Sequence, residues 1–185
     1  MKATGIVRRI DDLGRVVIPK EIRRTMRIRE GDPLEIYTDR EGKVIFKKYS
    51  PIGELASFAA QYAETLHRFC SLAVIICDRD AIIACSGVPK KDYSEKSLSA
   101  ELEHVMEGRN LYFHREGDAP MPVLSEDSAF EVSCAMPIIS EGDVVGCVAS
   151  VVDRTRDTRR DVPTGEVETK LILTAAGFLG KQLET

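Results

Sequence analysis

Short apolar runs separated by turn-forming residues mark the first 50 residues of the chain. These runs are rich in β-branched side chains and predict four strands, at residues 5–10, 15–18, 34–38 and 43–48. Residues 11–14 and 39–42 combine Asp and Gly between two strands, which is typical of hairpin turns. Proline suits the first turn of a helix, so Pro19–Met26 is expected to be helical. The predicted order is strand, strand, helix, strand, strand.

A longer periodic pattern begins after Ser50. Apolar residues recur three and four positions apart in three segments, which predicts helices at residues 51–68, 97–107 and 166–183. Other apolar runs predict strands at residues 72–77, 81–86, 111–115, 131–139 and 144–152. Consecutive strands joined by tight turns must be antiparallel. The sequence therefore predicts an α+β fold, in which an antiparallel sheet carries helices at both ends of this second segment.

Charge divides the chain at the same place. The whole chain has a net charge of −4, but residues 1–50 hold 13 basic and 8 acidic side chains, whereas residues 51–185 hold 13 and 22. A basic segment beside an acidic body predicts two domains, over residues 1–50 and 51–185. No apolar run is long enough to span a membrane and no signal-peptide core is seen, so a cytoplasmic protein is expected.

The first 50 residues contain few large apolar side chains for a core of their own. Two explanations are open. The segment is a marginal subdomain that packs on the rest of the chain, or two copies interlock and complete each other's core. We favour the second explanation, which makes residues 1–50 a dimerisation domain.

Basic side chains are concentrated in the first 30 residues: Lys2, Arg8, Arg9, Arg15, Lys20, Arg23, Arg24, Arg27 and Arg29. The planar guanidinium group binds phosphate oxygens and the edge of guanine, so this cluster is a candidate DNA contact. Arg23 and Arg27 are four residues apart and are expected on one helix face, with Arg24 beside them. The first predicted hairpin places Arg8 across from Arg15. The alternative is a solvated charged surface, balanced by the acidic residues in between.

Residues 5–49 resemble the AbrB-like swapped-hairpin DNA-binding domain, and the stretch LGRVVIPKEIRR, residues 13–24, is the most specific part. That family forms an interlocked dimer, so the resemblance implies that two copies build one core. It also implies binding to double-stranded DNA, which would associate the protein with the nucleoid. Four arginines match the DNA contacts of the family and three further basic residues are added as candidates: Arg8, Arg15, Arg23 and Arg24, then Lys2, Arg9 and Arg27.

The second domain, with the hairpin PIISEGDVVGCV at residues 137–148, is similar to the GAF-like domain of sporulation regulators that begin with an AbrB-like module. The resemblance implies a regulator of late sporulation genes, either an activator or a repressor. A GAF-like domain also implies a small-ligand pocket, which we expect the loops at 86–93 and 116–130 to line. A GAF-like domain that only oligomerises is the open alternative. An antitoxin-like protein that binds a toxin and represses its own operon is the alternative function.

No enzymatic activity is expected. The chain lacks a GxSxG, HExxH or P-loop motif, and His67, His104 and His114 lack the spacing of metal ligands. The sequence therefore indicates no catalytic residue, no metal and no cofactor.

The five cysteines form no CxxC pair and are expected to be reduced thiols in apolar strands. A tight turn after residue 77 puts Cys77 and Cys85 on opposite faces of the sheet. A hairpin closed at Ser140–Asp143 makes Cys134 and Cys147 diagonal neighbours on one face, where a thiol pair remains open.

The helices predicted at 51–68 and 166–183 have wider apolar faces than packing on one sheet requires, with Ile52, Ile172 and Leu183 as extra positions. We therefore expect each helix to meet its counterpart in a second subunit and to form a helical bundle. Together with dimerisation through residues 1–50, this predicts a homotetramer.

Overall fold

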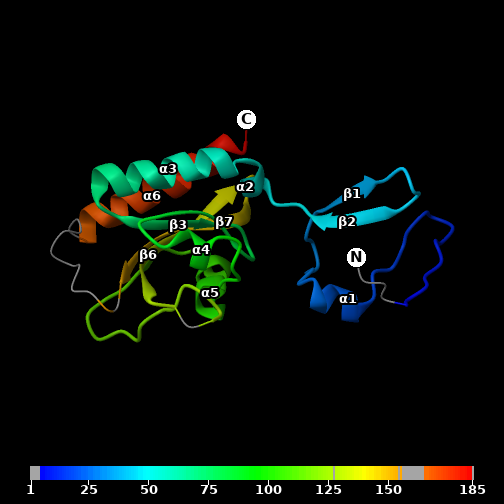
Figure 1. Ribbon diagram of the computed structural model, residues 1–185, viewed down its shortest axis with the longest axis horizontal. Coiled ribbons are helices and arrows are strands. Elements are labelled where there is room, and N and C mark those ends of the chain that lie inside the picture. Colours follow the sequence, from blue (N-terminus) through cyan, green and yellow to red (C-terminus); the bar gives the residue numbers. More distant parts are fainter. Residues whose placement is uncertain (1–4, 127, 154, 156–164, 185) are drawn as a thin grey trace. The chain divides into compact units, whose positions relative to one another are not determined.

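The computed structural model describes residues 5–126, 128–153, 155 and 165–184, and the chain divides into two compact units (Figure 1). The first unit extends from Met1 to Tyr49 and the second from Ser50 to Thr185. The division lies where the balance of charge along the chain changes from basic to acidic.

The first unit contains one short helix, α1 (Lys20–Thr25), and one antiparallel hairpin of β1 (Leu34–Thr38) and β2 (Val44–Lys48). Asp39 closes the hairpin turn, because its Oδ1 accepts hydrogen bonds from the N–H groups of Glu41 and Lys43, each at 2.9 Å. The predicted helix and second hairpin are therefore confirmed, and the helix begins after Pro19, whose backbone is not helical.

The two strands predicted before the helix, at residues 5–10 and 15–18, are not formed in the described chain. What is present is their turn, in which the Asp11 N–H donates to the Arg15 carbonyl and the Gly14 N–H to the Asp11 carbonyl, both at 3.0 Å. A strand needs a neighbouring strand to pair its main-chain hydrogen-bonding groups. Beyond this turn, residues 5–10 and 15–18 pair neither with each other nor with another described strand, so the prediction of two strands is wrong.

The first unit buries almost nothing. Pro19 is the one buried residue among residues 5–49. Val7 is 86% exposed, and Leu13 and Val17 are each 70% exposed. Burying a side chain of this size is worth about 1.5–3 kcal/mol, so this unit leaves unused the main interaction that stabilises a folded domain.

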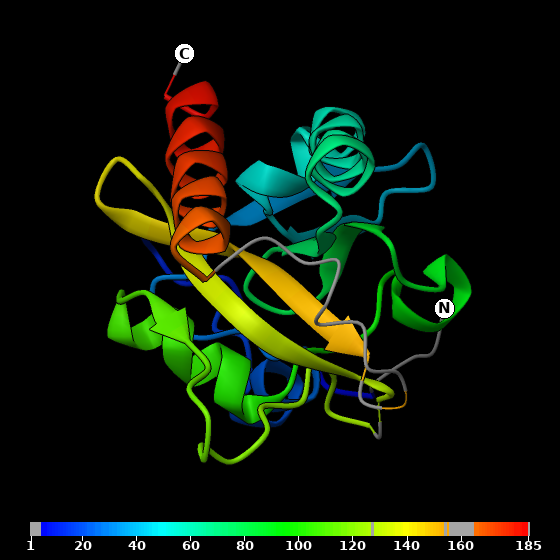
Figure 2. The same cartoon turned by 90° about the vertical axis from the view of Figure 1, so that its left-hand side faces the viewer.

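The second unit is built on a five-stranded antiparallel sheet in the order β4-β3-β7-β6-β5 (Figure 2). Its strands are β3 (Ala73–Cys77), β4 (Ile82–Ser86), β5 (Tyr112–Phe113), β6 (Phe130–Ser140) and β7 (Asp143–Asp153). Its helices are α2 (Pro51–Glu54), α3 (Ala56–Cys70), α4 (Lys90–Tyr93), α5 (Ala100–Gly108) and α6 (Gly165–Gln182). This is the predicted α+β fold, with α3 and α6 at the two ends of the segment.

Apolar clusters fill both faces of this sheet. On one face α3 and α6 pack against the strands, and Leu66, Ile76 and Leu179 are buried there. On the other face α5 covers the sheet, and Ile75 and Leu102 are buried. The neighbours Ile75 and Ile76 enter opposite clusters because successive strand side chains point to opposite faces. None of the described helices combines the length and the apolar character that a membrane-spanning segment needs.

Capping residues explain where the helices of this unit begin. The Ser50 side chain accepts a hydrogen bond from the Gly53 N–H at 3.1 Å and starts α2. The helix predicted from residue 97 begins only at Ala100, because Ser99 is its N-cap and accepts from the Leu102 N–H at 3.1 Å. The helix predicted over 51–68 is interrupted at Leu55 and then extends to Cys70.

A β-bulge changes the predicted arrangement of the first two strand cysteines. The register of β3 against β4 shifts between Ile76 and Cys77, and Cys77 and Cys85 enter the same apolar cluster. The prediction that these two cysteines lie on opposite faces is therefore wrong. An extra residue in one strand changes which residues of the two strands share a face, and a tight turn in the sequence gives no sign of it.

A second bulge separates the other two cysteines. The register of β6 against β7 shifts between Ile138 and Ile139, and Cys134 and Cys147 lie in opposite clusters. The prediction of diagonal neighbours is wrong for the same physical reason. All five cysteines are free thiols.

Candidate nucleic-acid interface

The six predicted DNA-contacting arginines are all exposed in the first unit: Arg8, Arg9, Arg15, Arg23, Arg24 and Arg27. Arg23 and Arg24 lie in the last turn of α1. Among the described residues, Arg15 has an acidic partner in Asp11, and no carboxylate lies within ion-pair distance of Arg8, Arg9, Arg23 or Arg24. Guanidinium groups that form no ion pair within the protein can bind the phosphate groups of nucleic acids.

Asp11 holds Arg15 in place. Its Oδ1 accepts hydrogen bonds from the N–H groups of Leu13 at 3.1 Å and of Arg15 at 2.7 Å, and its Oδ2 accepts one from Arg15 Nε at 2.9 Å. The bonds from Arg15, first its main-chain N–H and then its side chain, lower the pKa of the Asp11 carboxyl. The contact uses Nε and leaves the terminal nitrogens of Arg15 available to a ligand.

The sequence shows Asp11 only as part of a turn and does not identify its contact with Arg15. The available signal is the spacing of four residues between a carboxylate and an arginine across a turn of Asp, Leu and Gly. That spacing brings the two side chains together here because the carboxylate also caps the turn.

The other end of the basic segment differs from the prediction. α1 ends at Thr25, and Arg27 adopts a left-handed backbone with a φ of 50°. The Ile28 N–H donates to the Arg23 carbonyl at 2.7 Å, which turns the chain away from the helix axis. Arg27 therefore does not share a helix face with Arg23. Its carbonyl accepts a hydrogen bond from Lys48 Nζ at 2.9 Å, which ties the end of α1 to β2.

Two further predictions about these residues are affected. The hairpin that sets Arg8 across from Arg15 is not formed, so the structure does not bring these side chains together in one chain. Lys2 lies outside the described residues.

A second candidate surface lies on the paired helices α3 and α6 of the second unit (Figure 1). The ring of Phe178 on α6 lies 5.8 Å from that of Phe58 and 5.7 Å from that of Tyr62, both on α3. Phe178 is 42% exposed, and Val167, which lies on the same side of the helix, is 47% exposed. Exposed aromatic and aliphatic side chains that cluster in this way mark a surface for protein association.

The three histidines lie apart and have local partners. His67 Nδ1 lies 3.1 Å from the Leu72 carbonyl, and His104 Nδ1 lies 3.7 Å from a carboxylate oxygen of Glu107. The described part of the chain holds no group of three or more side chains suited to a metal ion.

Comparison with known proteins decides the family. A family model described as "Stage V sporulation protein T C-terminal, transcription factor" matches residues 54–184. Stage V sporulation protein T of Bacillus subtilis (strain 168) is 52% identical over 184 residues, which cover 100% of this chain and 99% of the relative. The chain belongs to the stage V sporulation protein T family. This confirms the resemblance to sporulation regulators, and the family is one of transcription factors.

Two solved structures and one further family model also match parts of this member of the stage V sporulation protein T family. The N-terminal DNA recognition domain of the Bacillus subtilis regulator AbrB is 65% identical, covers 28% of this chain and 94% of that chain, and has a TM-score of 0.25. A GAF domain of A. aeolicus nlh2 is 13% identical, covers 73% and 85%, and has a TM-score of 0.46. A model described as "Antidote-toxin recognition MazE, bacterial antitoxin" matches only residues 7–54, which leaves the antitoxin alternative with the weaker support.

Proposed function

We propose that this protein regulates late sporulation genes by binding double-stranded DNA through its first unit. The observation that carries the proposal is the group of exposed arginines without acidic partners, next to an Arg15 that Asp11 holds in place. Membership of a family of sporulation transcription factors supports it. The function requires no catalytic residue, metal or cofactor.

The arginines have different tasks in this proposal. Arg23 and Arg24 at the end of α1 are the candidates for base edges, since a guanidinium group donates two parallel hydrogen bonds to guanine. Arg8 and Arg15 flank the turn and contact DNA beside them. Arg9 binds phosphate, as do the two remaining candidates, Arg27 and Lys2. Phosphate contacts position the protein, and base contacts select the sequence.

The first unit works as a swapped dimer. Its exposed apolar side chains, among them Val7, Leu13 and Val17, need a cover that the single chain does not provide. A second copy would supply both this cover and the strand neighbours that residues 5–10 and 15–18 lack. Two copies would also bring two sets of arginines to one duplex.

The second unit joins these dimers into a homotetramer through the aromatic surface of α3 and α6. Phe58, Tyr62 and Phe178 would pack against the same residues of another subunit in a helical bundle. Linking two DNA-binding dimers raises the effective concentration of the second after the first has bound. The tetramer would therefore bind long DNA more tightly than either dimer.

A gel-shift titration with Arg24→Ala tests the DNA contact, with Arg40→Ala as the matched control. Both side chains are exposed arginines of the first unit, but Arg40 lies in the turn between β1 and β2. Arg24→Ala is expected to weaken specific binding by about 1–3 kcal/mol if it contacts a base, and Arg40→Ala much less. Equal affinity of Arg24→Ala and the unchanged protein at physiological salt would contradict the assignment.

The place of the protein in spore formation is tested in the cell. Mapping the DNA that it binds during sporulation, together with transcript levels in a deletion strain, is expected to show bound sites upstream of late genes. Transcripts that fall in the deletion strain identify activated genes, and transcripts that rise identify repressed ones. Bound sites without any late sporulation gene would contradict this part of the proposal.

A further inference from the structure

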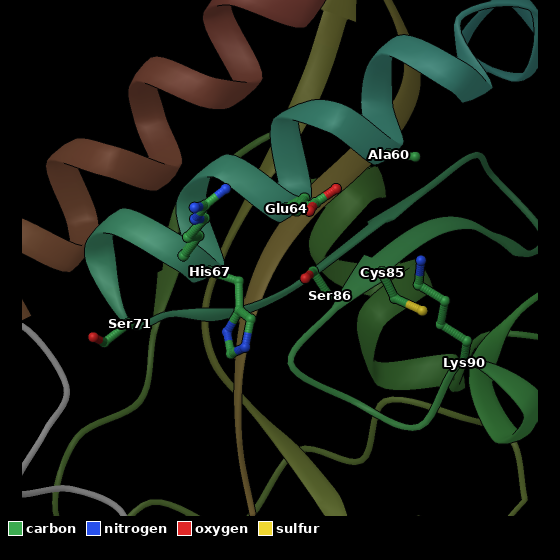
Figure 3. Close-up of a pocket in the computed structure, with 8 residues that line it drawn as sticks. Ala60, Glu64, His67, Ser71, Cys85, Ser86 and Lys90 are labelled. Carbon is green, nitrogen blue, oxygen red and sulfur yellow. The ribbon is translucent and has the colours of Figure 1, made fainter.

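A cavity of about 660 Å³ opens between α3 and the end of β4 in the second unit (Figure 3). Figure 3 shows His67 to the left of Ser86, Cys85 and Lys90 to its right, and Glu64 on α3 above it. The volume lies within the range of about 300–1,000 Å³ that small-molecule sites occupy. The cavity belongs to one unit, so its shape does not depend on how the two units are placed.

The local sequence explains why there is space here. Ala60, Glu64, His67 and Ser71 are spaced by four, three and four residues, so they form one stripe along α3 and its C-terminal cap. Small residues stand at both ends of the stripe. β4 is an edge strand of the described sheet, so only one side of it is paired with another strand.

Gly87 fixes the position of the His67 ring. A Cβ atom at residue 87 would lie 2.7 Å from His67 Nδ1, so only glycine allows this approach, and its φ of 82° also favours glycine. His67 Nδ1 lies 3.1 Å from the Leu72 carbonyl, which can only accept a hydrogen bond. Nδ1 therefore carries the proton of the neutral ring, and Nε2 is the nitrogen that is left for another partner.

Two basic side chains line the cavity without forming an ion pair to any described residue. Among the described residues, no carboxylate lies within ion-pair distance of Arg68 or Lys90, both of which line the cavity. Three other lysines of this acidic unit each have a glutamate partner: Lys96, Lys170 and Lys181. The Cys85 thiol is 6% exposed, and the nearby charge of Lys90 acts on its pKa against the larger raising effect of burial. Lys90 therefore lies at the wall of the cavity without a carboxylate partner among the described residues.

We propose that this cavity binds a small organic acid, with a carboxylate or phosphoryl group that accepts hydrogen bonds from Lys90 and Ser86. Arg68 adds positive charge at the same opening. Glu64, which also has no basic partner among the described residues, accepts a hydrogen bond from a hydroxyl or amino group of the ligand. The proposal adds ligand binding to DNA binding and is independent of it. Since α3 also carries Phe58 and Tyr62, the ligand would contact the helix that joins subunits.

The test measures dissociation constants for the full chain by isothermal titration calorimetry at constant ionic strength. Inorganic phosphate, citrate and O-phosphoserine serve as probes, which separate phosphoryl from carboxylate recognition. Lys90→Ala is compared with Lys91→Ala, because Lys91 is the adjacent exposed lysine of α4 and does not line the cavity. At least one probe is expected to bind the unchanged protein and Lys91→Ala equally, and to bind Lys90→Ala about tenfold more weakly.

A second variant distinguishes binding inside the cavity from general electrostatic attraction. Ala60→Leu keeps every charge and places a larger side chain at the exposed rim, and it is expected to reduce binding of the same probe. Gel shifts of Lys90→Ala should match the unchanged protein, so a failed DNA-binding proposal would be seen separately. Equal weakening by Lys90→Ala and Lys91→Ala would overturn the site. So would the absence of binding by every probe at about 10 mM, a concentration that detects even millimolar affinity.

Discussion

The two units of this chain differ in how many apolar side chains they bury. In the second unit, both faces of the sheet are covered, and side chains such as Ile75 and Ile76 are fully buried in separate clusters. In the first unit, Pro19 alone is buried among residues 5–49. The second unit is therefore complete as a single chain, whereas we propose that the first is completed by another copy. If the proposed dimer forms, the DNA-binding unit and its dimer interface are one structure.

The largest expected effect is that salt changes DNA binding by the first unit far more than the stability of the second unit. If a dimer of the first unit neutralises about 6–10 phosphates, DNA affinity falls by roughly 10³–10⁵ between about 50 and 200 mM salt. The stability of the second unit should change little over the same range, because its clusters are apolar. Fluorescence anisotropy with labelled DNA measures the first effect and chemical unfolding the second. A flat affinity would indicate that the arginines do not bind phosphates.

Matched isoleucine substitutions compare the two kinds of core. Ile76 is fully buried and Ile36 is 61% exposed. Ile76→Ala is expected to lower the free energy of unfolding of the second unit by about 2–5 kcal/mol, at any protein concentration. Ile36→Ala should instead weaken association, because the proposed dimer covers this side chain with a second copy. Unfolding curves at two protein concentrations distinguish these outcomes, and an Ile36→Ala protein with unchanged association would break the comparison.

Most of the fold follows from the sequence pattern, and the failures have specific physical causes. The periodicity of α3 and α6 and the alternation of the long hairpin are local signals, and each is found in the structure. Residues 5–10 and 15–18 carry the same local signal but pair with no strand in the described part of the chain. Local pattern predicts the tendency of a segment, whereas strand pairing depends on what lies beside it.

The site residues show the same division. Exposure of Arg23 and Arg24 follows from their place in a charged helix. The contact between Asp11 and Arg15 and the left-handed backbone of Arg27 depend on hydrogen bonds that composition does not reveal. The sequence suggested loops as the lining of a pocket, and of these residues Ser86 and Lys90 line the cavity beside α3. None of the described residues between 116 and 130 does so.

A smaller effect concerns the positioning of Arg15. Asp11→Ala removes the three hydrogen bonds that the carboxylate accepts and is expected to weaken DNA binding by about 1 kcal/mol. Loss of a negative charge close to DNA acts in the opposite direction, so Asp12→Ala serves as the control for charge alone. The effect of Asp11→Ala should also disappear in an Arg15→Ala background. Additive effects in this double-mutant cycle would show that Asp11 does not act through Arg15.

The smallest effect is expected for an exposed ion pair of the second unit. Lys170 Nζ lies 2.6 Å from a carboxylate oxygen of Glu166, one turn apart on α6. Lys170→Ala should change the free energy of unfolding by at most about 0.5 kcal/mol, because exposed pairs are well solvated. A loss as large as that of Ile76→Ala in the same unfolding measurement would show that surface charge, not the apolar clusters, stabilises this unit.

Sedimentation equilibrium on the fragment of residues 1–53 and on the full chain tests the central claim most directly. The account predicts a dimeric fragment, because two copies complete the first unit, and a tetrameric full chain, because α3 and α6 add a second contact. A fragment that is folded and monomeric would contradict the claim that the first unit needs a second copy. A full chain that remains a dimer would contradict the second contact.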